Sequence, residues 1–208
     1  MHGGAIAVRH SIRDESYAAR QAQSSHSKQK IGERSALLIK DNDIVGIDSG
    51  TCAEALARSI QNVHNVTFIV HSLSVANILA DKILNGEITG NIIILNGTVI
   101  PETRTVSGMS TLSQIKNYRM NKAFVAVTAI SEDGFMSGIE NDGTFSLELI
   151  RQSDSSYIIA ESEKIGKQSF YRFAEFYEVN ALITDSENPI NYSIKKRMSE
   201  CGMEIICT

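Results

Sequence analysis

Asp48-Ser49-Gly50-Thr51-Cys52 is the stretch that decides the fold of this chain. It follows Ile44–Ile47, an apolar run that predicts a buried strand, and it precedes residues 53–60, which predict a helix. A turn of small residues between a strand and a helix leaves backbone N–H groups without partners at the positive end of the helix dipole. Gly50 lets a ligand approach that backbone, and the Ser49 and Thr51 hydroxyls add donors. The turn suits a phosphate or, equally well, a simple helix N-cap.

The rest of the chain alternates strand-like and helix-like segments. Apolar runs of strand length lie at residues 44–47, 66–70, 92–95, 123–127, 157–160, 181–184 and 204–207. Helical patterns fill most of the intervals, at 53–60, 73–84, 109–118, 144–152 and 190–201. This alternation predicts an α/β fold with a largely parallel sheet and helices on both faces. Ligands of such sheets bind beyond the carboxyl ends of the strands.

The two ends of the chain carry their own signals. Residues 1–30 are polar, which predicts a linker or arm and the start of a helix over 15–39; residues 31–208 form the predicted globular domain. The apolar face of that first helix suits packing on the sheet or against another subunit. For the last helix, Asn188 is the expected cap, Pro189 the first turn and Gly202 the stop.

Composition excludes several classes of protein. The chain has 208 residues, a formal net charge of −4 and 42% hydrophobic residues, so it has a real core and lacks the basic excess of a domain that holds DNA by itself. Three cysteines without a Cys-x-x-Cys pair indicate reduced thiols in the cytoplasm, and the scattered histidines predict no metal site. No run is long enough to span a membrane. Nucleotide-binding and nucleophile-elbow motifs are missing, so we expect neither a cofactor nor a catalytic residue.

Two segments interrupt the alternation. Residues 98–107 contain Pro101 and predict a short hairpin or excursion. Residues 168–178 are aromatic, and their partial alternation favours an edge strand with inward rings over an aromatic ligand cage.

Several polar residues stand at the predicted carboxyl ends of strands. Asp48 suits hydrogen bonds to sugar hydroxyls or, equally, the fixing of the turn and the cap of the next helix. Ser72 is most simply a helix cap. The glycine at 97 indicates an unusual backbone angle or close approach of the backbone. Ser107-Gly108 precedes another helix and is a weaker version of the small-residue turn at 48–52, and Thr128 follows the strand at 123–127.

Three further side chains are candidates with ordinary alternatives. Arg104 lies in the excursion and is a candidate to bind a phosphate, because a guanidinium suits that partner, although surface charge is the commoner role of a lone arginine. Lys164 follows the strand at 157–160 and suits an ion pair with Asp48 or with a ligand phosphate, although a solvated loop lysine is the commoner role. Cys52 at a helix start lacks any histidine tied to it by a motif, which argues against a nucleophile.

Taken together, these stretches resemble the DeoR family of bacterial transcription regulators, over almost the whole chain and as the C-terminal effector-sensing domain. In the first half of the chain, His2-Gly3-Gly4-Ala5 resembles the family's linker, Asp48-Ser49-Gly50-Thr51 matches its Asp-Ser-Gly-Thr-Thr loop with Cys52 in place of the last Thr, and His71-Ser72-Leu73 matches Asn-Ser-Leu. Asn96-Gly97 stands where the family usually has Gly-Gly, and Ser107-Gly108 matches a Ser…Gly element. Near the C-terminus, Ser162-Glu163-Lys164-Ile165-Gly166 resembles Ser-Lys-Phe-Gly with one extra residue before the Lys, and Leu182-Ile183-Thr184-Asp185 matches Ile-Thr-Asp.

This resemblance implies a fold similar to that of sugar-phosphate isomerases and CoA transferases. It implies a phosphorylated sugar effector, with its phosphate on residues 49–52 and with Asp48 and Lys164 as ligand-site residues. It implies a homo-oligomer, dimer or tetramer, that meets operator DNA through an N-terminal winged helix-turn-helix missing from this sequence. An isomerase or deaminase on the same fold is the alternative, but Thr128 and Ala129 stand where the related isomerases place an acidic motif. A pure oligomerisation module is the third reading.

Overall fold

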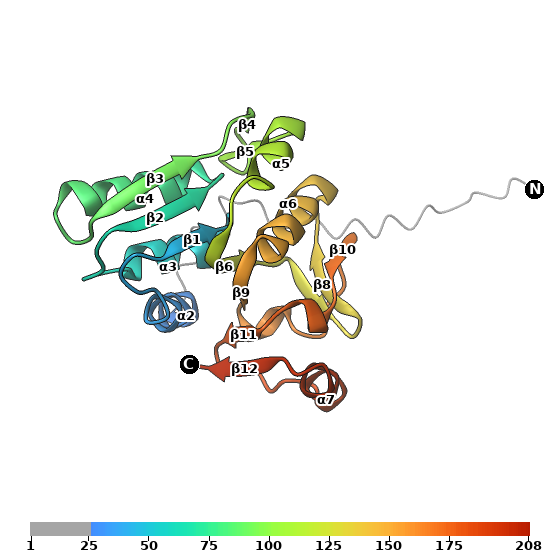
Figure 1. Ribbon diagram of the computed structural model, residues 1–208. Helices are drawn as coiled ribbons and strands as arrows, with labels where there is room; N and C mark the ends of the chain where they lie inside the picture. The colour runs from blue at the N-terminus through green and yellow to red at the C-terminus, as the bar shows by residue number, and fades with distance from the viewer. Residues whose placement is uncertain (1–25) are drawn as a thin grey trace, which may run out of the picture.

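Seven parallel strands form the main sheet in the computed structural model, which describes residues 26–208 (Figure 1). The sheet has the order β12-β11-β9-β6-β1-β2-β3, and every neighbouring pair runs parallel. Its strands are β1 (Ile44–Ile47), β2 (Val66–Val70), β3 (Gly90–Ile94), β6 (Met120–Ala126), β9 (Ser153–Ile159), β11 (Ala181–Thr184) and β12 (Glu204–Cys207). The predicted α/β fold with a parallel sheet is confirmed, and four of the seven predicted strands have the expected bounds.

Helices cover both faces of this sheet. They are α2 (His26–Ala36), α3 (Thr51–Ser59), α4 (Leu73–Leu84), α5 (Met109–Ile115), α6 (Glu140–Arg151) and α7 (Tyr192–Glu200). The predicted first helix, 15–39, ends at Ala36, and its part before residue 26 lies outside the described residues, as does the arm predicted for residues 1–25.

Alternate residues of each strand feed two separate cores. In β6, Phe124 packs into one apolar cluster while Ala123 and Val125 pack into the other. The first cluster also holds the buried side chains of α2, α3 and α4, and the second holds those of α5, α6 and α7. Strands buried on both faces need continuous apolar runs, which is why the strands are visible in the sequence. Ile31 of α2 is completely buried in the first cluster, so the apolar face of this helix lies on the domain itself.

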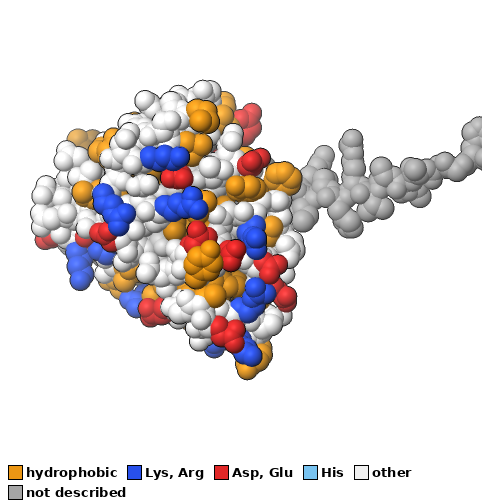
Figure 2. Space-filling model, turned by 45° about the vertical axis from the view of Figure 1, so that its right-hand side comes forward, with side chains coloured by type: hydrophobic (Ala, Val, Ile, Leu, Met, Phe, Trp, Pro, Cys, Tyr) orange, Lys and Arg blue, Asp and Glu red, His pale blue; other side chains and the backbone are white. Residues whose placement is uncertain are grey.

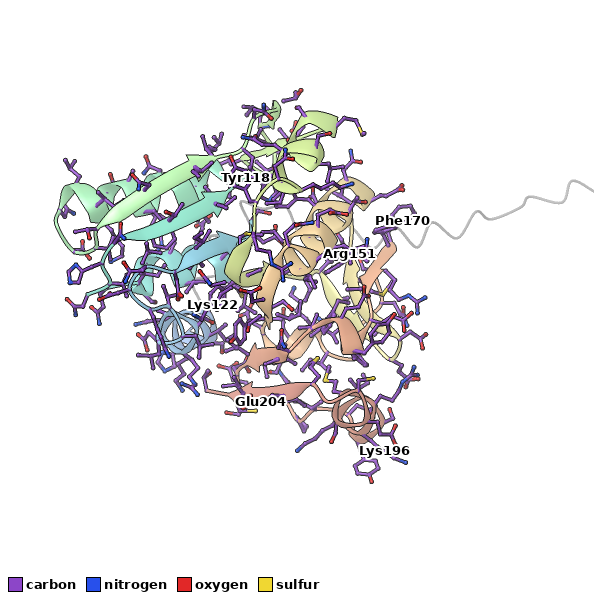
Figure 3. All side chains as sticks on the ribbon, in the orientation of Figure 1. Tyr118, Lys122, Arg151, Phe170, Lys196 and Glu204 are labelled. Carbon is purple, nitrogen blue, oxygen red and sulfur yellow. The ribbon has the colours of Figure 1, made fainter. Side chains whose placement is uncertain are left out.

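Two smaller sheets flank the main one. The excursion at 98–107 is a hairpin of β4 (Thr98–Ile100) and β5 (Thr105–Ser107), as the sequence predicted. A three-stranded antiparallel sheet, which the sequence did not reveal, joins β7 (Ala129–Ser131), β8 (Gly134–Ser137) and β10 (Tyr171–Ala174). Strand β10 is the predicted aromatic edge strand. Its Phe173 is buried, whereas Phe170 stands exposed beside it (Figure 3).

The cap of α7 differs from the prediction. Asn191 caps this helix by accepting a hydrogen bond from the Ser193 N–H, so the predicted cap at Asn188 is wrong. The Asn188 backbone and side chain instead donate to Ser162 Oγ at 3.0 and 3.1 Å. The side-chain amide thus binds the neighbouring loop, and the cap lies three residues later than predicted. Pro189 therefore lies before the helix, so its predicted place in the first turn is wrong as well. Gly202, with φ of 75°, ends the helix as expected.

Charges are mixed on the surface. Figure 2 shows Lys and Arg interspersed with Asp and Glu on one face. The basic run of α7 is exposed, and Lys196 pairs there with Glu200 at 3.7 Å (Figure 3). Within the described residues, no helix combines the length and the apolarity that crossing a membrane requires.

The contact between α2 and α3 gives a first prediction. A Cβ on Gly32 would lie 2.5 Å from the Ala55 carbonyl carbon and 2.8 Å from the Leu56 nitrogen, so the two backbones touch there. We expect Gly32→Val to lower the free energy of unfolding by about 1–3 kcal/mol, the usual cost of overpacking, in urea denaturation. Lys30→Val, on the exposed side of the same helix, controls for helix propensity. Equal losses in the two variants would contradict this close packing.

Candidate functional site

A cavity of about 120 Å³ lies beyond the carboxyl ends of β1, β6 and β9. One water needs roughly 10–15 Å³ by this measure, so the cavity has the size for a small polar ligand. Its polar lining comes from segments far apart in the sequence, namely Lys28, Asp48, Ser49, Thr51, Cys52, Thr103, Thr128, Ser137, Asp142, Ser146, Glu161, Glu163 and Lys164.

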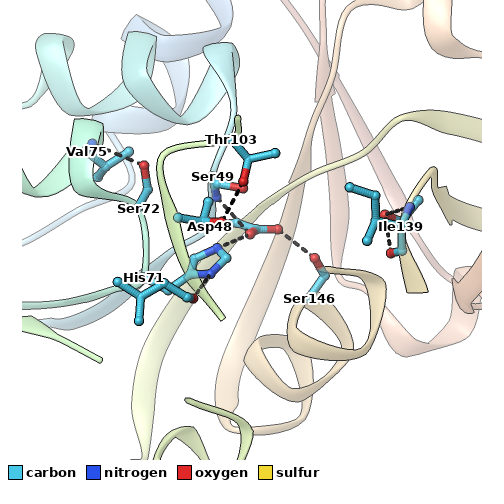
Figure 4. A network of polar contacts seen from close by, with 11 residues as sticks. Asp48, Ser49, His71, Ser72, Val75, Thr103, Ile139 and Ser146 are labelled. Carbon is cyan, nitrogen blue, oxygen red and sulfur yellow. Dashed lines mark hydrogen bonds and ion pairs between the residues drawn. The ribbon is translucent and has the colours of Figure 1, made fainter. Parts of the chain in front are cut away.

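Asp48 is the most constrained side chain of the cavity wall (Figure 4). It is only 4% exposed. One carboxylate oxygen lies 3.1 Å from His71 Nε2 and accepts from the Ser49 N–H at 2.8 Å, while the other accepts from Ser146 Oγ at 2.7 Å. This carboxylate therefore ties together the ends of β1 and β2 and helix α6. The predicted cap of α3 by Asp48 is wrong, because α3 begins after Gly50 without a side-chain cap.

His71 fixes the far side of that network. Its Nδ1 lies 3.1 Å from the Val106 carbonyl oxygen, and its ring stacks on Phe145 with centroids 3.9 Å apart. Both ring nitrogens face oxygen acceptors. The contact with the Val106 carbonyl is a hydrogen bond when Nδ1 carries a proton. The contact with Asp48 is a hydrogen bond when a proton lies on Nε2 or on the carboxyl group. The ring thereby joins the β4–β5 hairpin to the cavity wall.

The start of α3 opens into the cavity. Gly50 is its N-cap residue, with φ of 105° and ψ of 171°, and no side chain caps the helix. The first turn of any helix has N–H groups without intrahelical acceptors, and here no serine or threonine hydroxyl takes them. The alternative of a simple side-chain N-cap is therefore wrong for this turn. Gly50 is needed for its positive φ, which other residues rarely adopt.

Two lysines reach the same cavity from different elements. Lys164 follows β9 and pairs with Glu163 at 3.2 Å, so the predicted pairing with Asp48 is wrong. Lys28 comes from α2 and lies 3.5 Å from Glu161. Burial, together with the charge of Glu161, raises the pKa of Cys52 to about 12, although both cations lower it. Cys52 is thus a protonated thiol at neutral pH, which removes the basis for a nucleophilic role.

A buried carboxylate positions the loop that carries Lys164. Asp185, at the end of β11, accepts hydrogen bonds from the N–H and hydroxyl of Ser162 and from the Glu187 N–H. Burial alone would raise the pKa of Asp185, but these hydrogen bonds lower it below its usual range. The ionised carboxylate therefore anchors the 3₁₀ turn Ser162–Lys164 against β11.

Asp142 differs from the other carboxylates of the cavity. It lies in the first turn of α6, and the described part of the chain gives its carboxyl neither a hydrogen bond nor an ion pair. Burial raises its pKa, the charge of Asp48 raises it further, and His71 lowers it. A half-buried acceptor without a protein partner suits the hydroxyl groups of a ligand.

The structure brings most, but not all, of the expected site residues together. Those that line the cavity are Asp48, Ser49, Gly50, Thr51, Cys52, Thr128 and Lys164. Ser72 caps α4 by accepting from the Val75 N–H at 3.3 Å, as its simpler interpretation predicted. Gly97 and Ser107 pack against each other, since a Cβ on Gly97 would lie 2.6 Å from the Ser107 carbonyl oxygen. Arg104 lines a separate groove between α3 and α4.

Other cavity residues were missing from the sequence-based set. Asp142 and Ser146 stand one helical turn apart on α6. The predicted helix began only at residue 144 and so left out Asp142, whereas Ser146 lies inside it and was not marked by any motif. Thr103, rather than Arg104, is the residue of the excursion that lines the cavity. Lys28 belongs to α2, which has no strand before it and so gave no signal. Among residues 26–208, no group of three or more His, Cys, Asp or Glu side chains has the arrangement to hold a metal ion.

Comparison with known proteins now decides the family. The family described as DeoR C terminal sensor domain matches residues 23–186. The chain belongs to the DeoR family. The turn at 48–52 and the loops carrying Lys164 and Asp185 are thus parts of a DeoR sensor domain, as their motifs indicated.

Relatives and a solved structure agree with this assignment. The HTH-type transcriptional repressor GlcR of Bacillus subtilis is 35% identical over 99% of this chain and 77% of its own length. The lactose phosphotransferase system repressor of Staphylococcus epidermidis is 29% identical over 99% of this chain and 79% of its own length. For two other relatives, the chain covers only 64% of the relative's own length. A 4-hydroxybutyrate CoA-transferase of Porphyromonas gingivalis, 17% identical, matches 84% of this chain and 50% of its own with a TM-score of 0.50, which shows a shared fold alone.

The raised pKa of Asp142 gives a prediction for the stability of this DeoR sensor domain. A carboxyl whose folded pKa is raised holds its proton more tightly when folded, so its ionisation lowers stability as the pH rises past about 3.9, the unfolded value. We expect Asp142→Asn to raise Tm at pH 7 by a few degrees, since 1 kcal/mol corresponds to about 2–4 °C at this size. The gain disappears below about pH 4.

Glu140→Gln is the matched control for this measurement. Glu140 lies in the same first turn of α6 but is exposed, so its neutralisation removes a favourable dipole interaction without relieving burial. Calorimetric melting curves at both pH values compare the two variants. A lower Tm of Asp142→Asn at pH 7 would show that the carboxylate stabilises the empty domain.

Proposed function

We propose that this domain senses a phosphorylated sugar for a transcriptional regulator of sugar metabolism that acts in the cytoplasm. The observation that carries the proposal is the start of α3, which has no side-chain cap and opens into a cavity flanked by Lys28 and Lys164. Unpaired N–H groups, the positive helix end and two ammonium groups together form a site for a dianionic ester.

The opposite wall of the cavity suits a sugar. Asp142, Ser137 and Thr128 supply acceptors and hydroxyl groups at the height of the β6 and β8 ends. Sugar hydroxyls both donate and accept, so a lining of carboxylates and hydroxyls matches them. Asp48 is already engaged on three sides, and in this proposal it holds the turn and the wall in place while its remaining lone pairs meet the ligand.

The names of the relatives support the choice of effector class. One of the relatives is a lactose phosphotransferase system repressor, and others are HTH-type transcriptional regulators. For this chain we infer a homo-oligomer, dimer or tetramer, whose arrangement depends on effector binding. Operator DNA is then bound by a helix-turn-helix part of the regulator, in line with the net charge of −4 of this sequence. The effector must bind one arrangement better than the other, since equal affinity shifts nothing.

Binding without turnover is part of this proposal. Isomerisation needs a base beside the carbonyl-bearing carbon of the sugar. Thr128 follows β6, its hydroxyl accepts from the Gly138 N–H at 3.1 Å, and a threonine is a poor base. Conversion of a pentose or hexosamine phosphate by the wild-type chain, lost in Asp48→Asn, would favour the isomerase or deaminase instead.

Calorimetric titration with a panel of pentose and hexose phosphates tests the proposal. We expect saturable binding of at least one ester, and Lys164→Met should weaken it about 10- to 100-fold, because a charge-assisted hydrogen bond contributes about 1.5–3 kcal/mol. Lys167→Met, three residues away on the exposed part of the same loop, should change affinity less than about twofold. A folded wild-type chain that binds no ester would refute the proposal.

A further inference from the structure

The side chain of Lys28 reaches the cavity from an element that contributes nothing else to it. Its side chain is only 9% exposed, and its Nζ lies 3.5 Å from Glu161 Oε2, whose side chain is 14% exposed. Both residues line the cavity beside the turn at 49–52. All other residues of the lining end or follow a strand or lie on α3, α6 or the hairpin, whereas Lys28 lies on α2, the first described helix.

Helix α2 is joined to the rest of the domain in two ways. Its middle packs directly on α3, where Gly32 meets the Ala55 backbone and Ile31 is fully buried. Its first turn is held by polar contacts instead, because Ser27 Oγ donates to Glu187 Oε1 and Lys28 pairs with Glu161. These two carboxylates follow β9 and β11. The first turn of α2 is thus fastened to the strand ends that form the cavity.

Lys28 acts on the turn by its charge as well as by its place in the cavity lining. Burial and the charge of Glu161 raise the pKa of the Cys52 thiol inside the turn, and Lys28 and Lys164 lower it. The pair of Lys28 and Glu161 is separated by 3.5 Å, which exceeds the 2.7–2.9 Å usual for a tight charge-assisted hydrogen bond. A buried ammonium in such a loose pair gains from a closer, doubly charged partner.

We propose that Lys28 is a ligand-binding residue of the effector site and that the phosphate of the effector takes it over from Glu161. This inference rests on the proposed function. The exchange changes the contacts of the first turn of α2, because Lys28 then pairs with a phosphate bound at the start of α3 and no longer with Glu161 after β9. Residues 1–25 join the domain through this helix, so α2 reports the occupancy of the cavity to that part of the chain.

Affinity measurements on matched lysine variants form the first test. Titration with inorganic phosphate and with the tightest-binding ester of the sugar-phosphate panel should show at least 10-fold weaker binding for Lys28→Met. Lys30→Met, on the exposed side of the same helix, should stay within about twofold of the wild type. Lys28→Arg should recover most of the affinity because it keeps the cation.

Removal of the competing carboxylate distinguishes ligand binding from a structural role. If Lys28 only stabilises α2, Glu161→Gln weakens the helix and leaves or lowers the affinity for phosphate. If the phosphate replaces Glu161, the same variant binds phosphate several-fold more tightly, because the competitor and its repulsion of the anion are gone. This gain of affinity is the expected result, and its absence would overturn the exchange.

Hydrogen exchange reads out α2 itself, in the wild-type chain and in Lys28→Met. Amides of α2 at residues 27–32 should change their exchange rates on saturation with the ester, and they should not change in Lys28→Met at matched saturation. Ester binding by the wild type with unaltered α2 exchange and unaltered Lys28→Met affinity would overturn this inference and leave the sensor function standing. No ester binding by the wild type would overturn both.

Discussion

The buried carboxylate of Asp48 is the constraint on which the site depends. Asp48 follows β1, accepts a hydrogen bond from the Ser49 N–H, and contacts His71 and Ser146. One side chain thus holds together the ends of β1 and β2 and helix α6. The Ser49 N–H donates to the Asp48 carboxylate at the end of the strand, and the next residue, Gly50, has a positive φ. The helix dipole of α3 then points its positive end into the cavity, and the N-cap residue Gly50 provides no side-chain cap. The conformation of this turn thus favours the binding of an anion at the start of α3.

The charges of the cavity are arranged in opposition. Two lysines flank the turn, yet each pairs with a glutamate, and the far wall holds Asp142, whose pKa burial raises. Without a ligand these carboxylates occupy the cations, so an arriving anion must displace them. Such competition lowers the affinity for the ligand. It also changes the contacts of the elements that carry the displaced carboxylates when a ligand occupies the cavity. A sensor needs such contacts that differ between the bound and the unbound state, whereas a site that only binds its ligand does not.

The sequence predicted the sheet well because its strands are buried on both faces. Val66–Val70 and Ala181–Thr184 are continuous apolar runs, so their bounds were visible, and polar residues after them marked the strand ends. The β7–β8 hairpin was not predicted because Ala129–Ser131 is only three residues long, too short for a strand pattern to show in the sequence. Of the site, the turn and Lys164 were foreseen by motif. Lys28 and Asp142 were not, since nothing local marks a helix residue that reaches across the fold.

Backbone amide shifts at the turn test the central claim most directly. In a ¹⁵N–¹H titration of this chain with a sugar phosphate, the amide signals of Gly50, Thr51 and Cys52 should move together and saturate with the phosphorus resonance of the ester. These amides form the uncapped start of α3, so direct phosphate contact shifts them most. An ester that binds with the same stoichiometry while these three signals stay in place would contradict an anion site at this turn.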